Sequence, residues 1–171
     1  WLMKINKRLK QIGDLVEANS FCLDVGCDHA FLDIYLVKKE CGIRAVASDI
    51  AEGPLDSAKS NIAKEKLEDK IDVRLGNGLD TYVINPYMVV CSKDSYLKKY
   101  DVLKNIKTII VSPNNYQEDV KRFLCKHGFY INDEVMVKEG KFIYQIIKFK
   151  KGKKRYSKKE FFFGPIFRKK G

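Results

Sequence analysis

Short apolar runs alternate with segments of helical period along this sequence, and this alternation constrains the fold more than any other feature. The strand-like runs cover residues 21–25, 43–48, 71–75, 88–91 and 107–111. The segments with helical period cover residues 5–18, 30–39, 54–65, 95–103 and 118–127. Such alternation favours a mostly parallel sheet with helices on both faces. Two further strands, 129–137 and 142–149, flank Glu139-Gly140 and are typical of an antiparallel hairpin. The predicted fold is therefore a seven-stranded α/β/α sandwich in three layers.

Polar residues follow the first three strands at the points where these strands end. Asp24-x-Gly26 closes the first strand, Asp49 closes the second, and Asn77 stands between two glycines after the third. In a parallel sheet these ends share the carboxyl edge, where ligands bind. Each feature alone is more often a helix cap or a turn. Together they favour a ligand-binding edge.

The chemistry of these three positions suggests which ligand this edge would hold. A glycine lets the backbone approach a ligand, and the helix after it offers free N–H groups. A carboxylate at Asp49 can accept both hydroxyls of a ribose, and the Asn77 amide could read an adenine edge. No G-x-G-x-x-G pyrophosphate motif is present. The pattern therefore favours an adenosine cofactor such as S-adenosylmethionine over a dinucleotide.

The net charge of +11 is concentrated at the end of the chain. Residues 138–171 contain 13 Lys and Arg against two acids, so the preceding residues are neutral overall. A basic end on a neutral body is typical of proteins that bind a polyanion, although a solvated lysine-rich tail would look the same. If the partner is a nucleic acid, we expect Lys153, Lys154 and Arg155 to contact its phosphates.

Several other classes of protein are disfavoured. The five cysteines form no CxxC pair, and only two histidines are present, so no metal site is expected. Scattered cysteines are typical of reduced thiols in a cytoplasmic protein. No apolar run is long enough to cross a membrane, and no signal peptide is expected. Trp1 suggests that the sequence begins after the native start.

Four motifs carry a resemblance to a known family. They are Asp24-Val25-Gly26-Cys27-Asp28-His29-Ala30-Phe31-Leu32, Glu52-Gly53-Pro54, Arg74-Leu75-Gly76-Asn77-Gly78-Leu79 and Ser112-Pro113-Asn114-Asn115. With these motifs, the sequence from about Leu9 to Arg168 resembles the bacterial tRNA (adenine-N1)-methyltransferases of the TrmK type. The resemblance implies a Rossmann-like class I methyltransferase that uses S-adenosylmethionine to modify adenine 22 of tRNA. It also implies a cytoplasmic enzyme, expected to act as a monomer without a metal or a membrane.

The resemblance also implies roles for particular residues. The cofactor would be lined by Asp24, Gly26, Asp28, Asp49, Ile50, Asn77 and Gly78. The target base would face Pro113 and Asn114, with Tyr116 as a stacking surface. Asp28, His29 and Asn114 are the candidate catalytic residues. Asp28 could stabilise the cationic product and His29 could assist proton loss; the alternative is that Asp28 caps the following helix and His29 packs.

The sequence departs from the family pattern in two places. A Gly-Met-Gly-Gly-like motif is expected after the fourth strand, but Ser92-Lys93-Asp94 follows Cys91. Either the motif is lost or a mobile loop is missing from the sequence. Asn85-Pro86-Tyr87 looks like a substrate loop of amino-methylating enzymes, but it precedes the fourth strand and so is not expected to touch substrate.

The domain division follows from the same resemblance. Residues 1–150 are expected to form the S-adenosylmethionine-binding domain. Residues 151–171 are expected to form a basic tail that leads to a C-terminal helical region absent from this chain. Two alternatives to the tRNA methyltransferase stay open: a catalytically impaired fold that only binds RNA, and a methyltransferase that acts on a small molecule.

Overall fold

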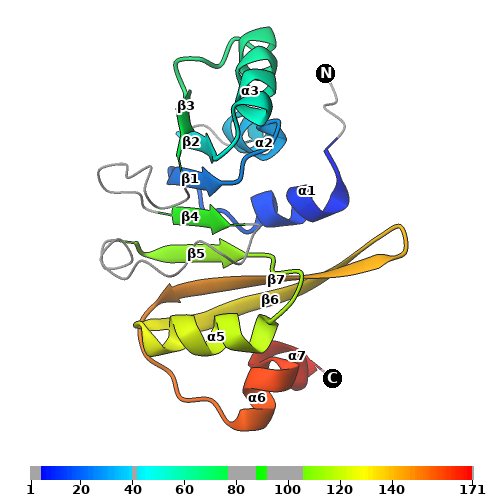
Figure 1. Cartoon of the computed structure of the whole chain (residues 1–171). Helices are drawn as coiled ribbons and strands as arrows, with labels where there is room; N and C mark the ends of the chain where they lie inside the picture. The colour runs from blue at the N-terminus through cyan, green and yellow to red at the C-terminus, as the bar shows by residue number, and fades with distance from the viewer. Residues whose placement is uncertain (1–4, 40–41, 77–87, 92–105, 171) are drawn as a thin grey trace.

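The computed structural model describes residues 5–39, 42–76, 88–91 and 106–170. Within these ranges seven strands form one sheet with the order β3-β2-β1-β4-β5-β7-β6 (Figure 1). The strands are β1 (Phe21–Val25), β2 (Arg44–Asp49), β3 (Ile71–Leu75), β4 (Met88–Cys91), β5 (Thr108–Val111), β6 (Phe129–Glu139) and β7 (Phe142–Lys151). The predicted α/β class with a C-terminal hairpin is confirmed.

The first five strands run parallel to one another, and only β7 and β6 run against their neighbours. The register pairs Val25 with Ser48 and Asp49 with Leu75, so β1, β2 and β3 end side by side. Their carboxyl ends therefore form one edge of the sheet, as the sequence predicts. We call it the carboxyl edge.

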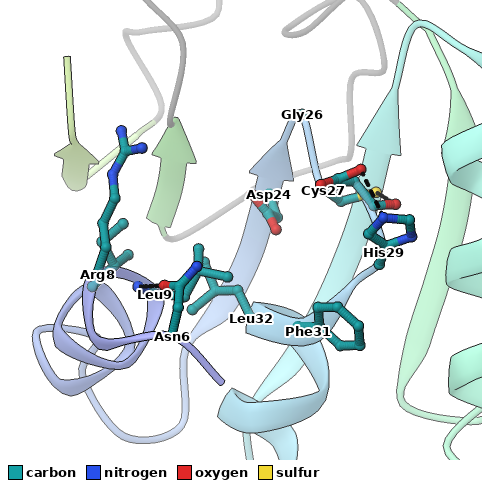
Figure 2. A pocket seen from close by; sticks show the side chains of 11 residues that line it. Asn6, Arg8, Leu9, Asp24, Gly26, Cys27, His29, Phe31 and Leu32 are labelled. Atoms are coloured by element: carbon teal, nitrogen blue, oxygen red, sulfur yellow. Dashed lines mark hydrogen bonds and ion pairs between the residues drawn. The ribbon is translucent and has the colours of Figure 1, made fainter. Parts of the chain in front are cut away.

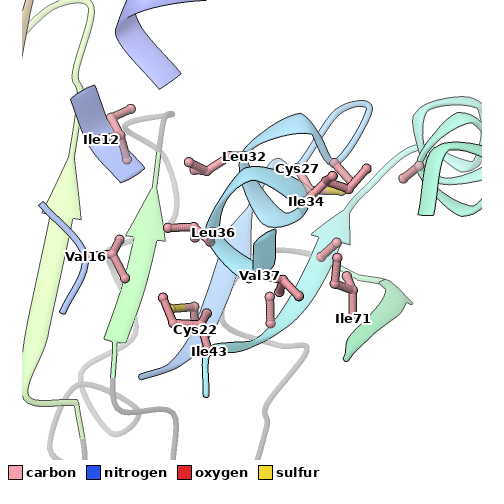
Figure 3. Close-up of a cluster of buried hydrophobic side chains, with 14 of the residues drawn as sticks. Ile12, Val16, Cys22, Cys27, Leu32, Ile34, Leu36, Val37, Ile43 and Ile71 are labelled. Atoms are coloured by element: carbon pink, nitrogen blue, oxygen red, sulfur yellow. The ribbon is translucent and has the colours of Figure 1, made fainter. Parts of the chain in front are cut away.

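Helices cover both faces of the sheet. They are α1 (Lys7–Asp14), α2 (Phe31–Lys39), α3 (Glu52–Lys64), α5 (Gln117–Lys126), α6 (Lys158–Phe163) and α7 (Pro165–Lys170). Side chains alternate across a strand, and the core divides accordingly. Cys22 and Ala45 pack with residues of α1, α2 and α3, whereas Leu23 and Val46 pack in the cluster that contains Val120 of α5. Figure 3 shows part of the first cluster, in which Leu32 and Leu36 of α2 lie over the sheet.

The bounds of α1 differ from the expected 5–18, because a polar side chain sets its start. The Asn6 side chain accepts a hydrogen bond from the Leu9 N–H at 2.8 Å and so caps the helix. Helices α2, α3 and α5 begin and end within two residues of their expected bounds, whereas α6 and α7 were not predicted. The expected helix at 95–103 lies outside the described residues, as does Asn85-Pro86-Tyr87.

The C-terminal segment folds back onto the body of the protein. Helices α6 and α7 pack against α5 and β6 (Figure 1). Tyr156 and Ile166 join the core on that face, whereas Phe162 and Phe163 remain exposed. The apolar residues at 161–167 are therefore only partly covered by the described residues.

No helix in the described ranges has the length and apolar character needed to cross a membrane. Within the same ranges, no cluster of three or more His, Cys, Asp or Glu side chains could hold a metal ion.

Candidate functional site

A cavity of about 310 Å³ opens at the carboxyl end of β1 (Figure 2). Its walls come from α1, from the loop after β1 and from the start of α2. The lining residues are Asn6, Arg8, Leu9, Ile12, Asp24, Gly26, Cys27, Asp28, His29, Phe31 and Leu32. Its volume lies at the lower end of the range for small-molecule sites. Four residues predicted from the sequence, Asp24, Gly26, Asp28 and His29, thus lie around one cavity.

The loop from Gly26 to Ala30 has an unusual backbone. Gly26 has φ +77°, and two residues with side chains, Asp28 and Ala30, also have positive φ values of 52° and 61°. The N–H groups of Gly26 and Cys27 both donate to the Ser48 carbonyl at 2.9 Å. Non-glycine residues in this region are strained and are common in ligand-binding loops. The loop is therefore held in a shape that local preference does not explain.

Asp49 holds this loop from the neighbouring strand. Its Oδ2 accepts the Asp28 N–H at 3.3 Å, and its Oδ1 accepts the Ala51 N–H at 3.2 Å. The side chain is buried. Asp49 does not line the cavity itself, but it fixes the backbone of a residue that does.

His29 is anchored to α3. Its Nδ1 lies 2.7 Å from Ser57 Oγ, and its carbonyl accepts a hydrogen bond from the Asn61 side chain at 3.0 Å. Its Nε2 lies 3.5 Å from Oδ1 of the exposed Asp28. Asp28 and His29 are thus adjacent at the cavity rim, with one imidazole nitrogen occupied by Ser57.

Two buried acids lie beneath the cavity. Asp24 lines it, and Asp33 of α2 is fully buried, with no cationic partner among the described residues. The two carboxyl groups lie close enough to share a hydrogen bond, which requires one of them to carry a proton. Burial raises the pKa of Asp24 to about 6. Burial, and next the charge of Asp24, raises the pKa of Asp33 well above its usual range.

Of the three remaining residues predicted to line the cofactor, the structure describes only Ile50. Ile50 follows Asp49 and is exposed. The Gly76 N–H donates to the Asp49 carbonyl at 3.0 Å, which brings the end of β3 to this edge. Asn77 and Gly78 lie outside the described residues.

A second cavity, of about 300 Å³, lies beyond the end of β5. It is lined by Pro113, Asn114, Gln117, Phe142, Ile143 and Tyr144. Two of the residues predicted to face substrate, Pro113 and Asn114, are therefore together at a cavity. Tyr116, the third, is 72% exposed and begins α5 with φ +59°, but it lines neither cavity.

Arg8 of α1 connects the two cavities, although no sequence motif singled it out. It lines the first cavity, and its Nη2 donates to the Ser112 carbonyl at 2.6 Å and to Asn114 Oδ1 at 3.4 Å. Its guanidinium lies over the Tyr144 ring, 4.3 Å from the centroid. In the sequence it is one basic residue on the polar face of an amphipathic helix, and its partners lie more than 100 residues away. No local signal could have identified it.

The basic residues expected to contact phosphates lie at the opposite edge of the sheet. The Lys151 N–H donates to the Lys107 carbonyl, just before β5 begins, and the Gly152 N–H donates to the Gly128 carbonyl. Lys153, Lys154 and Arg155 follow directly and are exposed. Lys154 Nζ lies 4.4 Å from the centroid of the Tyr130 ring. The structure does not bring these three residues to either cavity.

Comparisons with known proteins agree with this geometry. The sequence profile of a family described as "Methyltransferase domain" matches residues 5–147. The chain is 26% identical over 160 residues to the tRNA (adenine(22)-N(1))-methyltransferase of Bacillus subtilis, which covers 85% of this chain and 64% of that relative. The chain thus spans less than two thirds of the length of that relative.

Solved structures of high similarity carry related names. The structure of a putative tRNA (m1A22) methyltransferase of Streptococcus pneumoniae, in complex with S-adenosyl-L-methionine, superposes with a TM-score of 0.88 at 32% identity. That match covers 97% of this chain and 82% of the other. TrmK of M. capricolum, in complex with S-adenosyl-homocysteine, gives a TM-score of 0.83 at 28% identity and covers 95% and 76% of the two chains.

Proposed function

This chain belongs to the methyltransferase domain family, and from that premise we propose that it transfers a methyl group from S-adenosylmethionine to N1 of adenine 22 in tRNA. The observation that carries the proposal is the cavity at the end of β1, in the fold shared with the S-adenosylmethionine complex of the Streptococcus pneumoniae protein. Within this proposal the enzyme acts in the cytoplasm, as a monomer and without a bound metal.

The residues at the cavity fit the proposed cofactor. S-adenosylmethionine carries an ammonium group, a carboxylate, an adenosine and the electrophilic methyl group that it supplies. Asp24 offers a buried carboxylate for a cation, and the Gly26 loop brings backbone to the cavity. Asp49 would accept ribose hydroxyls, because each of its oxygens accepts only one hydrogen bond from the described residues and a carboxylate oxygen can accept two. Ile50, Asn77 and Gly78 complete the proposed cofactor shell.

The protein's task in the reaction is mainly alignment. N1 of adenine has an in-plane lone pair and needs no prior deprotonation, so the enzyme must hold it in line with the methyl group at about 3 Å. The exposed Asp28 carboxylate would stabilise the positive charge that develops on the base. His29 Nε2, beside Asp28, could take up a proton. Asn114 would contact the base edge.

The test of this proposal is a methyl-transfer assay on an unmodified tRNA transcript. N1-methyladenine blocks the Watson–Crick edge, so reverse transcription should stop at position 22, and a transcript with guanine there should give no stop. Methylation of free adenosine but not of tRNA would assign a small-molecule methyltransferase instead. Binding of tRNA without any transfer would assign a protein that only binds RNA.

Two variants test the cofactor placement. Asp49→Ala should weaken S-adenosylmethionine binding by about 1.5–3 kcal/mol, the range for a charged hydrogen-bond acceptor. Gly26→Val should abolish binding while the protein stays folded, because a branched side chain at Gly26 would fill the space where the backbone borders the cavity. Calorimetry with unfolding controls measures both. Normal affinity in either folded variant would place the cofactor elsewhere.

The substrate residues need a separate test. Asn114→Ala should lower turnover more than it lowers cofactor affinity; an equal fall in both would place Asn114 in the cofactor shell.

Neutralising Lys153, Lys154 and Arg155 together should flatten the slope of log tRNA affinity against log salt by roughly two to three units, at about 0.7–0.9 per phosphate contact. An unchanged slope would remove these residues from the proposed tRNA contacts. The division into a domain at 1–150 and a basic segment at 151–171 stays part of this proposal.

A further inference from the structure

The β6–β7 hairpin extends well past the strand that it pairs with. β5 pairs with β7 only from Thr108–Lys150 to Val111–Ile147, so Phe142 to Ile146 continue beyond the last pair. Five residues of extended strand span about 16 Å. In Figure 1 the hairpin projects from the sheet on the side where β5 ends. Phe142 and Ile143, near the tip, are 55% and 67% exposed.

The second cavity lies between this projection and the turn after β5. Phe142, Ile143 and Tyr144 form one wall, and Pro113, Asn114 and Gln117 form the other. A purine base needs apolar surface for its faces and a few hydrogen-bonding groups for its edges. This cavity offers both, because it combines two aromatic rings with two side-chain amides.

Arg8 places the second cavity next to the first. The same side chain lines the cofactor cavity, donates to Asn114 and lies over Tyr144. An exposed base in the second cavity would therefore lie across Arg8 from the cofactor cavity. Arg8 also restrains the Asn114 amide, because it donates to Asn114 Oδ1, and the Nδ2 group stays available as a donor.

The charge at the tip fits a nucleic acid. Lys138 and Lys141 are exposed on either side of the hairpin turn, and Lys141 Nζ lies 5.4 Å from the centroid of the Phe142 ring. A lysine beside an exposed aromatic ring is the pairing that binds a phosphate and stacks a neighbouring base. These residues are also nearer to the carboxyl edge than Lys153, Lys154 and Arg155 are.

From these observations we propose that the second cavity receives the adenine that the enzyme exposes from tRNA, with Phe142 as the ring on which it stacks. The proposal rests on the proposed function and names the substrate subsite of that same reaction. Phe142 would touch the substrate directly, and Arg8 would be a positioning residue that acts through Asn114.

The experiment compares Phe142→Ala with Phe142→Tyr on full-length protein, and uses Phe162→Ala as the matched control. Phe162 is also an exposed phenylalanine, at 66%, but it lies on α6 and lines neither cavity. Because stacking of one base is worth a factor of about 10 to 100, Phe142→Ala should lower kcat/KM for tRNA by that factor. Phe142→Tyr should restore most of it, Phe162→Ala should have no effect, and S-adenosylmethionine affinity should be equal in all four proteins.

The outcomes separate this proposal from the proposed function. If the parent protein methylates tRNA and Phe142→Ala does so equally well, the subsite is wrong and the function stands. An equal loss in the Ala and Tyr variants, or the same loss in Phe162→Ala, also overturns the subsite. If size-exclusion chromatography shows that Phe142→Ala dissociates a dimer, the tip is a contact between copies instead. An inactive parent protein would overturn both proposals together.

Discussion

The protein buries a carboxylate on each face of its sheet, and the two are stabilised in opposite ways. Glu134 of β6 lies 2.9 Å from Lys121 Nζ, accepts the Ile166 N–H at 3.0 Å, and packs under Gly164. Asp33 of α2 has no cation beside it among the described residues and faces a second acid, Asp24. One carboxylate lies beside a cation, whereas burial and the neighbouring acid favour the protonated form of the other.

This difference indicates that the Glu134 region has a structural role and the Asp33 region a role in ligand binding. A buried ion pair fixes its partners firmly, since either charge left alone is costly. Glu134 therefore fastens α7 and the turn at Gly164 to the sheet. A buried acid with only another acid beside it stabilises nothing by itself. Asp33 shares a hydrogen bond with Asp24, which lines the first cavity, and a ligand-binding site can retain such a cost.

The largest expected effect comes from breaking the ion pair on the α5 face. Lys121→Met would leave Glu134 buried without its cation and should lower the free energy of unfolding by about 3–5 kcal/mol. Lys126→Met, on the exposed last turn of the same helix, should stay within about 0.5 kcal/mol of the parent. Urea unfolding followed by circular dichroism measures both. Equal small effects would mean that Glu134 needs no counter-charge.

A smaller effect of opposite sign is expected on the α2 face. Asp33→Leu replaces a buried carboxyl that faces another acid with an apolar side chain among Leu32, Ile34 and Leu36. It should raise the free energy of unfolding by about 1–3 kcal/mol at pH 7.5. Asp56→Leu, at an exposed position of α3, serves as the control and should change little. Destabilisation by Asp33→Leu would show that the hydrogen bond between Asp33 and Asp24 outweighs the cost of burying the Asp33 carboxyl.

The smallest expected effect is the pH dependence of stability that the buried acid Asp24 supplies. Because the folded pKa of Asp24 is raised to about 6, its protonated form favours the folded state, and that stability is lost as pH rises through this value. The contribution of Asp24 to the free energy of unfolding should therefore fall by about 1 kcal/mol between pH 5 and pH 7, and the raised pKa of Asp33 adds a fall of the same sign. Asp33→Leu should reduce this fall, because it removes the neighbouring acid. A parent protein that gains stability over this range would reverse the assignment.

Much of the fold could be predicted from the sequence because nearby residues mark where its strands end. β1 and β3 begin and end where expected, since Gly26 and Gly76 follow apolar runs of five residues directly. The parallel register then brings Gly26 and Asp49 to one edge, as alternation of strand and helix requires. The start of α1 was missed because one side chain, Asn6, decides it.

The site was predicted only where its residues stand in local motifs. No local motif identifies Arg8, Asp33 or Phe142. Their importance depends on contacts with residues far away in the sequence, or on burial in the folded core. The proposed tRNA contacts Lys153, Lys154 and Arg155 stay a prediction, because their position bears on neither cavity. A charge run is conspicuous in the sequence, but the antiparallel direction of β7 delivers it to the edge of the sheet away from both cavities.

The contact between Tyr156 and β6 affects how copies of the protein meet one another. β6 is the last strand of the sheet, and such a strand can recruit a strand from another chain. At Ile131, just before the register shift at Asp133, the phenol of Tyr156 accepts the N–H at 3.0 Å and donates to the carbonyl at 3.5 Å. One hydroxyl group thus occupies both backbone groups through which an incoming strand would attach. Tyr156 thereby blocks the pairing of another chain with β6 at Ile131, which disfavours edge-to-edge aggregation.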